Sequence, residues 1–168
     1  HEDEFPVTRE KYCLVNLPKN IVSGDFYWFS KRKGLLIAAV ADCTGHGVPG
    51  AFMSMLGISF LNQVVNENEV YSPPMILNQV RQRVVNVLHH KGFNGGMYDG
   101  MEIGILCYDF DSQRLVFSGL GIDLVLFIPD NEGEYNYEGL IGEPNLLGLG
   151  FTKEYHSCHE LAIKPGTR

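Results

Sequence analysis

The order of the predicted elements indicates an α+β fold with antiparallel sheets. Strand-like segments come first, two helical segments follow as one block, and further strand-like segments complete the chain. Because the helices do not alternate with the strands, a doubly wound parallel sheet is disfavoured. The 168 residues suffice for one domain with a substantial core but not for two, so we expect a single domain over residues 1–168.

The first half of the chain predicts three strands. Residues 12–17 and 21–30 have strand-like composition and are separated by Pro18-Lys19-Asn20. Residues 35–41 (LLIAAVA) are apolar throughout, which predicts a strand in the sheet interior that is covered on both faces. Two sheets packed face to face, with helices outside, would bury such a strand.

Two helices are predicted next, followed by three strands. Residues 51–65 are apolar over most of a helical circumference and predict a buried helix, with Pro49 suited to its first turn. Ser72 and the two prolines after it predict the start of a second, amphipathic helix. The strands that follow are expected at 101–109, 114–120 and 123–129, with a hairpin turn over 109–112.

Composition and charge exclude several classes of protein. The net charge is −7 and the 13 basic residues are scattered, which argues against a nucleic-acid surface. The four cysteines show no C-x-x-C spacing and fit buried free thiols in a reducing compartment. No signal peptide and no apolar run long enough to span a bilayer is apparent in the sequence. We therefore expect a cytoplasmic globular domain without membrane contact.

The glycine-rich segment ADCTGHGVPGA (41–51) first suggests a nucleotide site. Gly45, Gly47 and Gly50 match the G-x-G-x-x-G dinucleotide fingerprint between a predicted strand and a predicted helix. That fingerprint also needs an acidic residue about 20 positions later, at the end of a second parallel strand. Glu67 lies at about that distance but in a segment that resembles a helix end. A nucleotide-binding oxidoreductase is therefore the less favoured hypothesis.

The alternative interpretation of the same turn is a metal site. Asp25 and Asp42 come from two predicted strands joined by a short hairpin, so their carboxylates could meet. Facing carboxylates repel and need compensation, which Mg²⁺ or Mn²⁺ supplies through oxygen ligands. The backbone carbonyl of Cys43 could turn toward such an ion. An ordinary structural explanation, in which Asp25 caps a bulge and Asp42 caps the turn, is slightly favoured by spacing alone.

Two motifs together resemble a known family. The segments PKNIVSGDFYW (18–28) and ADCTGHGVPGA (41–51) resemble the paired motifs of the SpoIIE-type serine phosphatases, the bacterial branch of the metal-dependent protein phosphatase 2C superfamily. DGMEIGILC (99–107) resembles the strand that follows the helical pair in that family, and EPNLLGL (143–149) resembles its P-x-L-G turn. The resemblance covers essentially the whole chain.

The resemblance implies an αββα sandwich of two antiparallel sheets flanked by helices, with a two-metal centre for Mn²⁺ or Mg²⁺. Asp25 and Asp42 match the metal-ligand aspartates, and Cys43 stands where a residue coordinates through its main-chain oxygen. Asp99 falls near a third, weakly bound metal of some members. The implied activity is hydrolysis of phosphoserine or phosphothreonine on a signalling protein by metal-activated water. The expected substrate is an anti-sigma-factor antagonist in a partner-switching pathway.

The histidine of the glycine turn does not match a catalytic role known in the superfamily. The eukaryotic branch has its proposed general acid two residues after the motif aspartate, where this chain has Thr44. His46 stands four residues after Asp42, so we expect it to hydrogen-bond the turn or the helix start.

The resemblance also predicts that the domain is incomplete at its C-terminal end. The family continues after a Pro-Gly turn into strands that carry two more metal-binding aspartates, and this chain stops at Pro165-Gly166-Thr167-Arg168. Missing last strands would leave an open edge that favours a homodimer, and the segment alone would be inactive or poorly loaded with metal. The first residue is not Met, which suggests a preceding sensor domain. A non-catalytic, phosphatase-like binding module is the alternative function.

Overall fold

The computed structural model describes residues 14–15, 17–18, 21–90, 100–147 and 157–168. Its larger sheet has five antiparallel strands in the order β1-β2-β3-β4-β7. A second sheet consists of β5 and β6. The strand bounds are β1 Phe26–Arg32, β2 Leu35–Cys43, β3 Met101–Asp109, β4 Arg114–Leu120, β5 Leu124–Pro129, β6 Tyr135–Leu140 and β7 His159–Ala162. The predicted α+β class with antiparallel sheets is confirmed.

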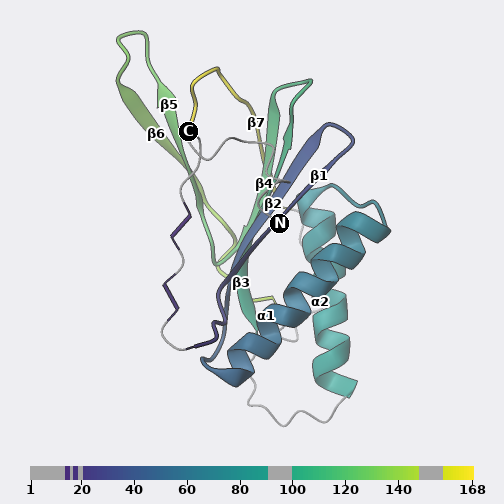
Figure 1. Cartoon of the computed structure of the whole chain (residues 1–168). Helices are drawn as coiled ribbons and strands as arrows, with labels where there is room; N and C mark the ends of the chain where they lie inside the picture. The colour runs from purple at the N-terminus through teal and green to yellow at the C-terminus, as the bar shows by residue number, and fades with distance from the viewer. Residues whose placement is uncertain (1–13, 16, 19–20, 91–99, 148–156) are drawn as a thin grey trace.

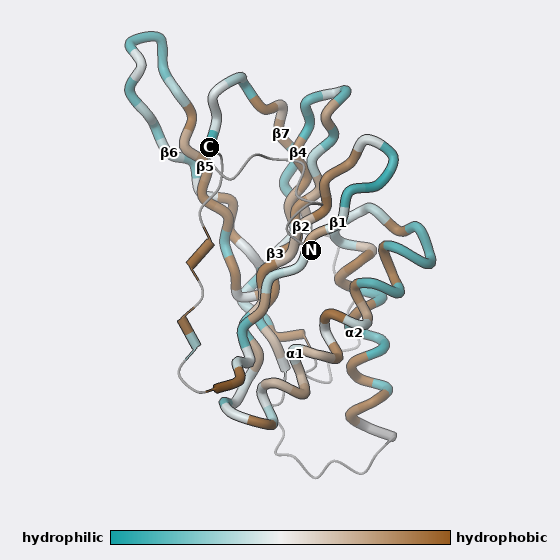
Figure 2. The backbone as a smooth tube through the Cα atoms, in the orientation of Figure 1, coloured by the Kyte–Doolittle hydropathy of each residue, from teal (hydrophilic) through white to brown (hydrophobic). Residues whose placement is uncertain are grey.

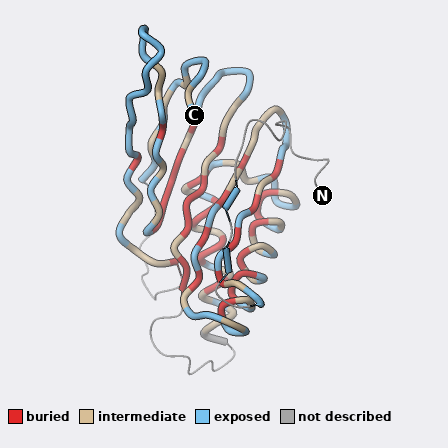
Figure 3. Tube along the Cα trace, turned by 60° about the vertical axis from the view of Figure 1, so that its left-hand side comes forward, coloured by how far each residue is buried: buried red, intermediate tan, exposed pale blue. Residues whose placement is uncertain are grey.

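Two helices lie side by side on one face of the larger sheet, and the β5–β6 hairpin lies on the other side (Figure 1). The first is α1 Val48–Leu61, which continues as the π-helical turn η3 Asn62–Glu67; the second is α2 Pro73–His90. The main core fills the space between the helices and β1, β2 and β3. A smaller cluster joins β4 to the second sheet through Leu115, Phe117, Leu126 and Leu140. Buried residues are concentrated along these contacts, whereas the hairpin tips are exposed and mostly hydrophilic (Figures 2 and 3).

The predicted strands of the second half agree closely with the structure, and those of the first half agree less well. Residues 14, 15 and 17 form no strand, and β1 begins at Phe26 rather than at Ile21. Ile21 is fully exposed and therefore has no sheet neighbour to pack against. The strand predicted at 12–17 is thus wrong for the described residues there.

The expectation that residues 35–41 are covered on both faces is also wrong. β2 lies between β1 and β3, but its burial alternates, and Val40 is 55% exposed. The helices cover only the face that carries Ile37, Ala39 and Ala41. The β5–β6 hairpin packs over β4 instead, which leaves the second face of β2 partly open among the described residues.

The helix predicted at 51–65 exists but is only partly buried. It packs onto the sheet through a row of mostly small residues that includes Gly50, Met53 and Gly57, while Phe52 and Met55 face outward. By length and composition alone, Val48–Glu67 could cross a membrane, contrary to the expectation from the sequence. Its position against the sheet is that of a core helix in a globular domain. Pro49 lies in the first turn, as predicted.

Candidate active site

Strand register places three carboxylates in a row at one end of the larger sheet. Phe26, the first residue of β1, pairs with Ala41 of β2, so Asp25, which immediately precedes β1, lies beside Asp42 of β2. Asp42 in turn pairs with Glu102 of β3. Because side chains alternate along a strand and Ala41 faces the helices, Asp42 points to the opposite face. The predicted meeting of Asp25 with Asp42 is therefore present in the fold.

The charges of this row are not balanced by the described part of the chain. Partial desolvation, then the hydrogen bond with Asp25, then the negative charges of Asp25 and Glu102 raise the pKa of Asp42. No Lys or Arg among residues 21–90, 100–147 and 157–168 forms an ion pair with these three acids. Oxygen donors in an uncompensated negative site suit a hard divalent cation. The paired carboxylates therefore suit the divalent metal that the family resemblance implies.

Glu102 was not predicted from the sequence as a site residue. It lies beside Asp42 only because β2 and β3 pair in one particular register, which no local motif encodes. Within the described residues, no three His, Cys, Asp or Glu side chains are close enough to enclose an ion. Glu102 thus extends the acidic row without completing a ligand set around the Asp25–Asp42 pair.

The glycines of the turn bring three backbone segments into contact. A Cβ atom at Gly50 would lie 2.8 Å from the carbonyl oxygen of Gly45 and 3.2 Å from the Cα of Gly24. Gly45 and Gly47 have φ values of 88° and 66°, which favour glycine. The motif therefore packs the start of α1 against the segment before β1, which supports the site with Asp25 and Asp42 at its edges.

The same geometry disfavours a dinucleotide site. Glu67 ends η3 and is followed by a second helix, not by a parallel strand with an acidic end. The sheet pairs of β1, β2 and β3 are antiparallel. The context that gives G-x-G-x-x-G its meaning in a nucleotide fold is therefore missing from the described elements.

The carbonyl oxygen of Cys43 lies against Gly24. A Cβ atom at Gly24 would be 3.0 Å from this oxygen, which is tighter than most Cβ contacts, so glycine favours the close approach. The carbonyl therefore faces the segment that leads into Asp25. The Cys43 thiol points into the core instead, and burial, followed by the charges of Asp42 and Asp25, raises its pKa to about 12.

This burial predicts unequal thiol reactivity. At pH 8, iodoacetamide should modify the exposed Cys158 at least about 100-fold faster than the buried Cys43, because the thiolate is the reacting form. Peptide mapping by mass spectrometry measures both rates, and the urea-unfolded chain is the control in which the two should converge. Equal rates in the folded protein would contradict the described packing of the turn.

Thr44 connects the turn by hydrogen bonds to Gly100, the residue that precedes β3. Its backbone N–H and its hydroxyl both donate to the carbonyl of Gly100, at 2.9 and 3.1 Å, and the Gly100 N–H donates to Thr44 Oγ1 at 2.9 Å. Thr44 is thus used in structure at the position where the eukaryotic branch has its histidine. Asp99 lies outside the described residues, so its predicted role as a third-metal ligand stays a prediction.

His46 does not fulfil the structural role expected from the sequence. Its side chain is exposed between Gly45 and Gly47, and its imidazole forms no hydrogen bond with the described residues. The turn is held by backbone packing and by Thr44 instead. The expectation that His46 hydrogen-bonds the turn or the helix start is therefore not met in this part of the chain.

The chain matches the family model described as Stage II sporulation protein E (SpoIIE) over residues 32–168. Among solved structures it is similar to the SiaA-PP2C domain of Pseudomonas aeruginosa, with a TM-score of 0.73 and 27% identity. That match covers 89% of this chain and 55% of the SiaA-PP2C chain, so the present chain spans about half of that relative. No curated protein sequence matches significantly.

Two further structures resemble this chain at the level of the fold. RsbX in complex with magnesium has a TM-score of 0.64 at 18% identity, and the match covers 91% of this chain and 67% of RsbX. The PP2C phosphatase domain of SpoIIE from Bacillus subtilis has a TM-score of 0.59 at 17% identity, with 88% and 40% covered. These matches agree with the α+β sandwich built from the strand register above.

Proposed function

Because the chain belongs to the SpoIIE family of PP2C-type serine/threonine protein phosphatases, we propose that Asp25 and Asp42 form half of a two-metal centre for phosphoester hydrolysis. The observation that carries the proposal is the pairing of these two carboxylates at the exposed end of β1 and β2. The carbonyl of Cys43 is the proposed main-chain ligand, and Asp99 is the proposed ligand of a third ion.

The fold family uses divalent metal ions, and one similar structure was determined with magnesium. Such ions, when bound, supply a nucleophilic hydroxide near neutral pH and neutralise charge on the phosphoryl oxygens. Either Mg²⁺ or Mn²⁺ suits an all-oxygen donor set.

The residues of this chain have distinct tasks in the proposed reaction. Asp25 and Asp42 would hold the ions at the sheet end, where the strand register places the two carboxylates side by side. The close packing of Gly24, Gly45 and Gly50 keeps the Cys43 carbonyl on the same side as Asp25. This positioning is needed because a preformed site loses less free energy to reorganisation when the ligand binds.

The proposed substrate is phosphoserine or phosphothreonine on a signalling protein. Similar structures come from the bacterial stressosome and from SpoIIE, described as a cell-fate determinant. Another similar structure contains RsbU and RsbW domains in one chain. These relatives support an anti-sigma-factor antagonist as the substrate, in a pathway where partner proteins exchange according to phosphorylation.

The test is a phosphatase assay with the full-length protein, a phosphoserine peptide and a matched phosphotyrosine peptide. We expect release of phosphate from phosphoserine that requires Mn²⁺ or Mg²⁺ and stops with EDTA. Metal binding without phosphate release would favour the non-catalytic signalling module instead. Thermal stabilisation by NADH, but by neither metal, would favour the oxidoreductase hypothesis and contradict the proposal.

A further inference from the structure

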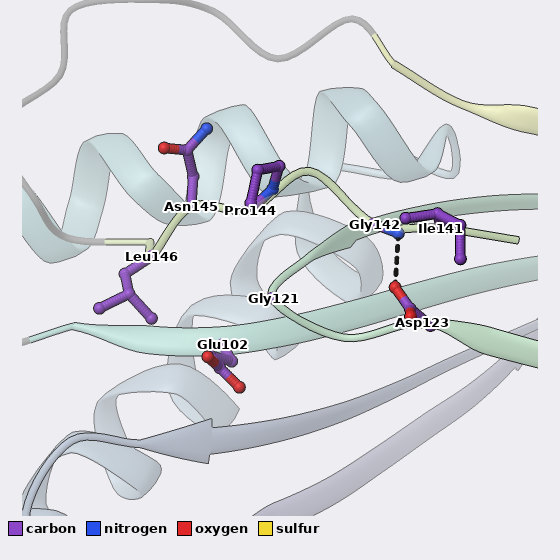
Figure 4. A pocket seen from close by; sticks show the side chains of 8 residues that line it. All are labelled: Glu102, Gly121, Asp123, Ile141, Gly142, Pro144, Asn145 and Leu146. Carbon is purple, nitrogen blue, oxygen red and sulfur yellow. Dashed lines mark hydrogen bonds between the residues drawn. The ribbon is translucent and has the colours of Figure 1, made fainter.

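An open groove lies next to the acidic row on the side of β3 and β4. Its volume is about 600 Å³, and its walls are Glu102 together with residues of the segments 121–123 and 141–146 (Figure 4). Glu102 is the strand neighbour of Asp42, so one wall of the groove lies one strand away from the proposed metal ligand. Paired strands place neighbouring Cα atoms only about 4.5–5.5 Å apart.

The two loops of the groove are fixed to each other and to the sheet. Gly121 N–H donates to the carbonyl of Glu143 at 2.8 Å, and Gly142 N–H donates to Asp123 Oδ1 at 2.8 Å (Figure 4). A Cβ atom at Gly142 would lie 2.4 Å from the carbonyl oxygen of Ile122, so the loops pack at backbone distance. Hydrogen bonds and backbone packing within the chain therefore determine the shape of the groove.

Among the residues that the structure describes, the charged side chains that line the groove are Glu102 and Asp123, and no Lys or Arg lines it. Glu102 reaches into it because Gly121 leaves room: a Cβ atom there would be 2.6 Å from Glu102 Cγ and 2.9 Å from Oε1. Asp123 uses one oxygen for Gly142 and retains acceptor capacity on the other. A phosphate group would be repelled here, whereas a cationic side chain would be attracted.

We propose that this groove binds the substrate segment next to the phosphoserine and selects a Lys or Arg side chain there. The inference rests on the proposed phosphatase function, since it places the phosphate at the Asp25–Asp42 pair. An extended peptide advances about 3.3–3.6 Å per residue, so a side chain within three positions of the phosphoserine reaches the groove. Asn145 adds an amide at the rim for the peptide backbone (Figure 4).

The test compares phosphoserine peptides that carry Lys, Ala or Glu within three positions on either side of the phosphoserine. With the Mn²⁺-loaded full-length protein, we expect kcat/KM for the best Lys peptide to exceed that of its Glu counterpart about fivefold, the scale of partly exposed ion pairs. Asp123→Asn keeps an oxygen for the Gly142 N–H and should reduce this ratio toward one. Glu102→Gln is the second variant, should Asp123→Asn fold poorly.

Glu138→Gln is the matched control, because Glu138 is an exposed acid on β6 that does not line the groove. This variant should keep the wild-type ratio of kcat/KM between the Lys and Glu peptides. In the wild type, 0.5 M salt should lower that ratio, because salt screens the attraction between the groove and the Lys side chain. Hydrolysis of all peptides at equal rates, or an unchanged ratio in both groove variants, would overturn the groove assignment alone. If no peptide is hydrolysed under any metal condition, the phosphatase proposal fails and the groove assignment fails with it.

Discussion

Asp42→Asn in the full-length protein is expected to lower kcat/KM for Mn²⁺-dependent hydrolysis of a phosphoserine peptide at least about 100-fold, because even outer-shell partners of metal ligands are worth 10–100-fold. Asp42 is the carboxylate between Asp25 and Glu102, so the substitution removes the central negative charge of the row and one of its two oxygen ligand atoms. Calorimetry should show a parallel loss of Mn²⁺ affinity. Turnover close to wild type in the variant would overturn the metal role of Asp42.

The same variant should be more stable than wild type when metal is removed. The pKa of Asp42 is raised in the folded state, so the folded chain holds this proton more tightly than the unfolded chain does. Stability is therefore lost as the pH rises from the normal carboxyl range through the raised pKa. At pH 7 in EDTA, Asn should raise the free energy of unfolding by about 0.5–1 kcal/mol, the scale of a partly exposed charge pair.

A pH series separates this effect from a general change in packing. The advantage of Asp42→Asn over wild type should shrink at low pH, where the wild-type carboxyl is protonated, and Glu138→Gln should show no such trend. In Mn²⁺ the order should reverse, because only the wild type gains stability from the bound ion. A variant that is less stable than wild type at pH 7 in EDTA would contradict the repulsion between Asp25 and Asp42.

A strand or helix could be predicted accurately from the sequence where a single residue pattern determines both the kind of element and its bounds. β3 and β4 have the bounds expected from the sequence, because alternating apolar residues flank a turn in which Asp109 accepts two backbone N–H bonds. β2 and α1 were predicted as fully covered because their apolar residues occur on every side. Composition does not show which side of such an element packs against the rest of the domain. In α1 the packed side is the one with small residues such as Gly50 and Gly57, since these allow a close approach to neighbouring segments.

In the candidate site, too, some residues could be predicted from the sequence and others could not. Asp25 and Asp42 could be paired from sequence because only Lys33 and Gly34, both with positive φ, separate β1 from β2 and fix the register. Glu102 reaches the same row across more than 50 residues of chain, and that register depends on the packing of the whole domain. The groove could not be foreseen either, because two separate loops form it.

Gly50→Ala is expected to destabilise the domain and to weaken metal binding, although alanine is the better helix former. Helix propensity alone would add about 1 kcal/mol of stability. The new methyl group, however, would lie 2.8 Å from the Gly45 carbonyl oxygen and 3.2 Å from Gly24 Cα, and both are backbone atoms that cannot rotate away. Overpacking of this kind costs about 1–3 kcal/mol and shifts the backbone. The shift displaces the glycine turn that directly follows Asp42 and Cys43 at the end of β2.

The expected net loss in the free energy of unfolding is about 1–2 kcal/mol, measured by urea denaturation in EDTA. Gly139→Ala is the matched control, because its nearest neighbour would be Ile141 Cδ1 at 3.8 Å, and it should change stability by less than about 0.5 kcal/mol. A stabilised Gly50→Ala protein would mean that the turn yields without cost, and the glycines would then not be needed to hold the site. If the Gly50→Ala protein is folded at low temperature but binds Mn²⁺ more weakly, the glycines serve to position the metal ligands. In that case the turn passes the displacement caused by the new methyl group on to Asp42.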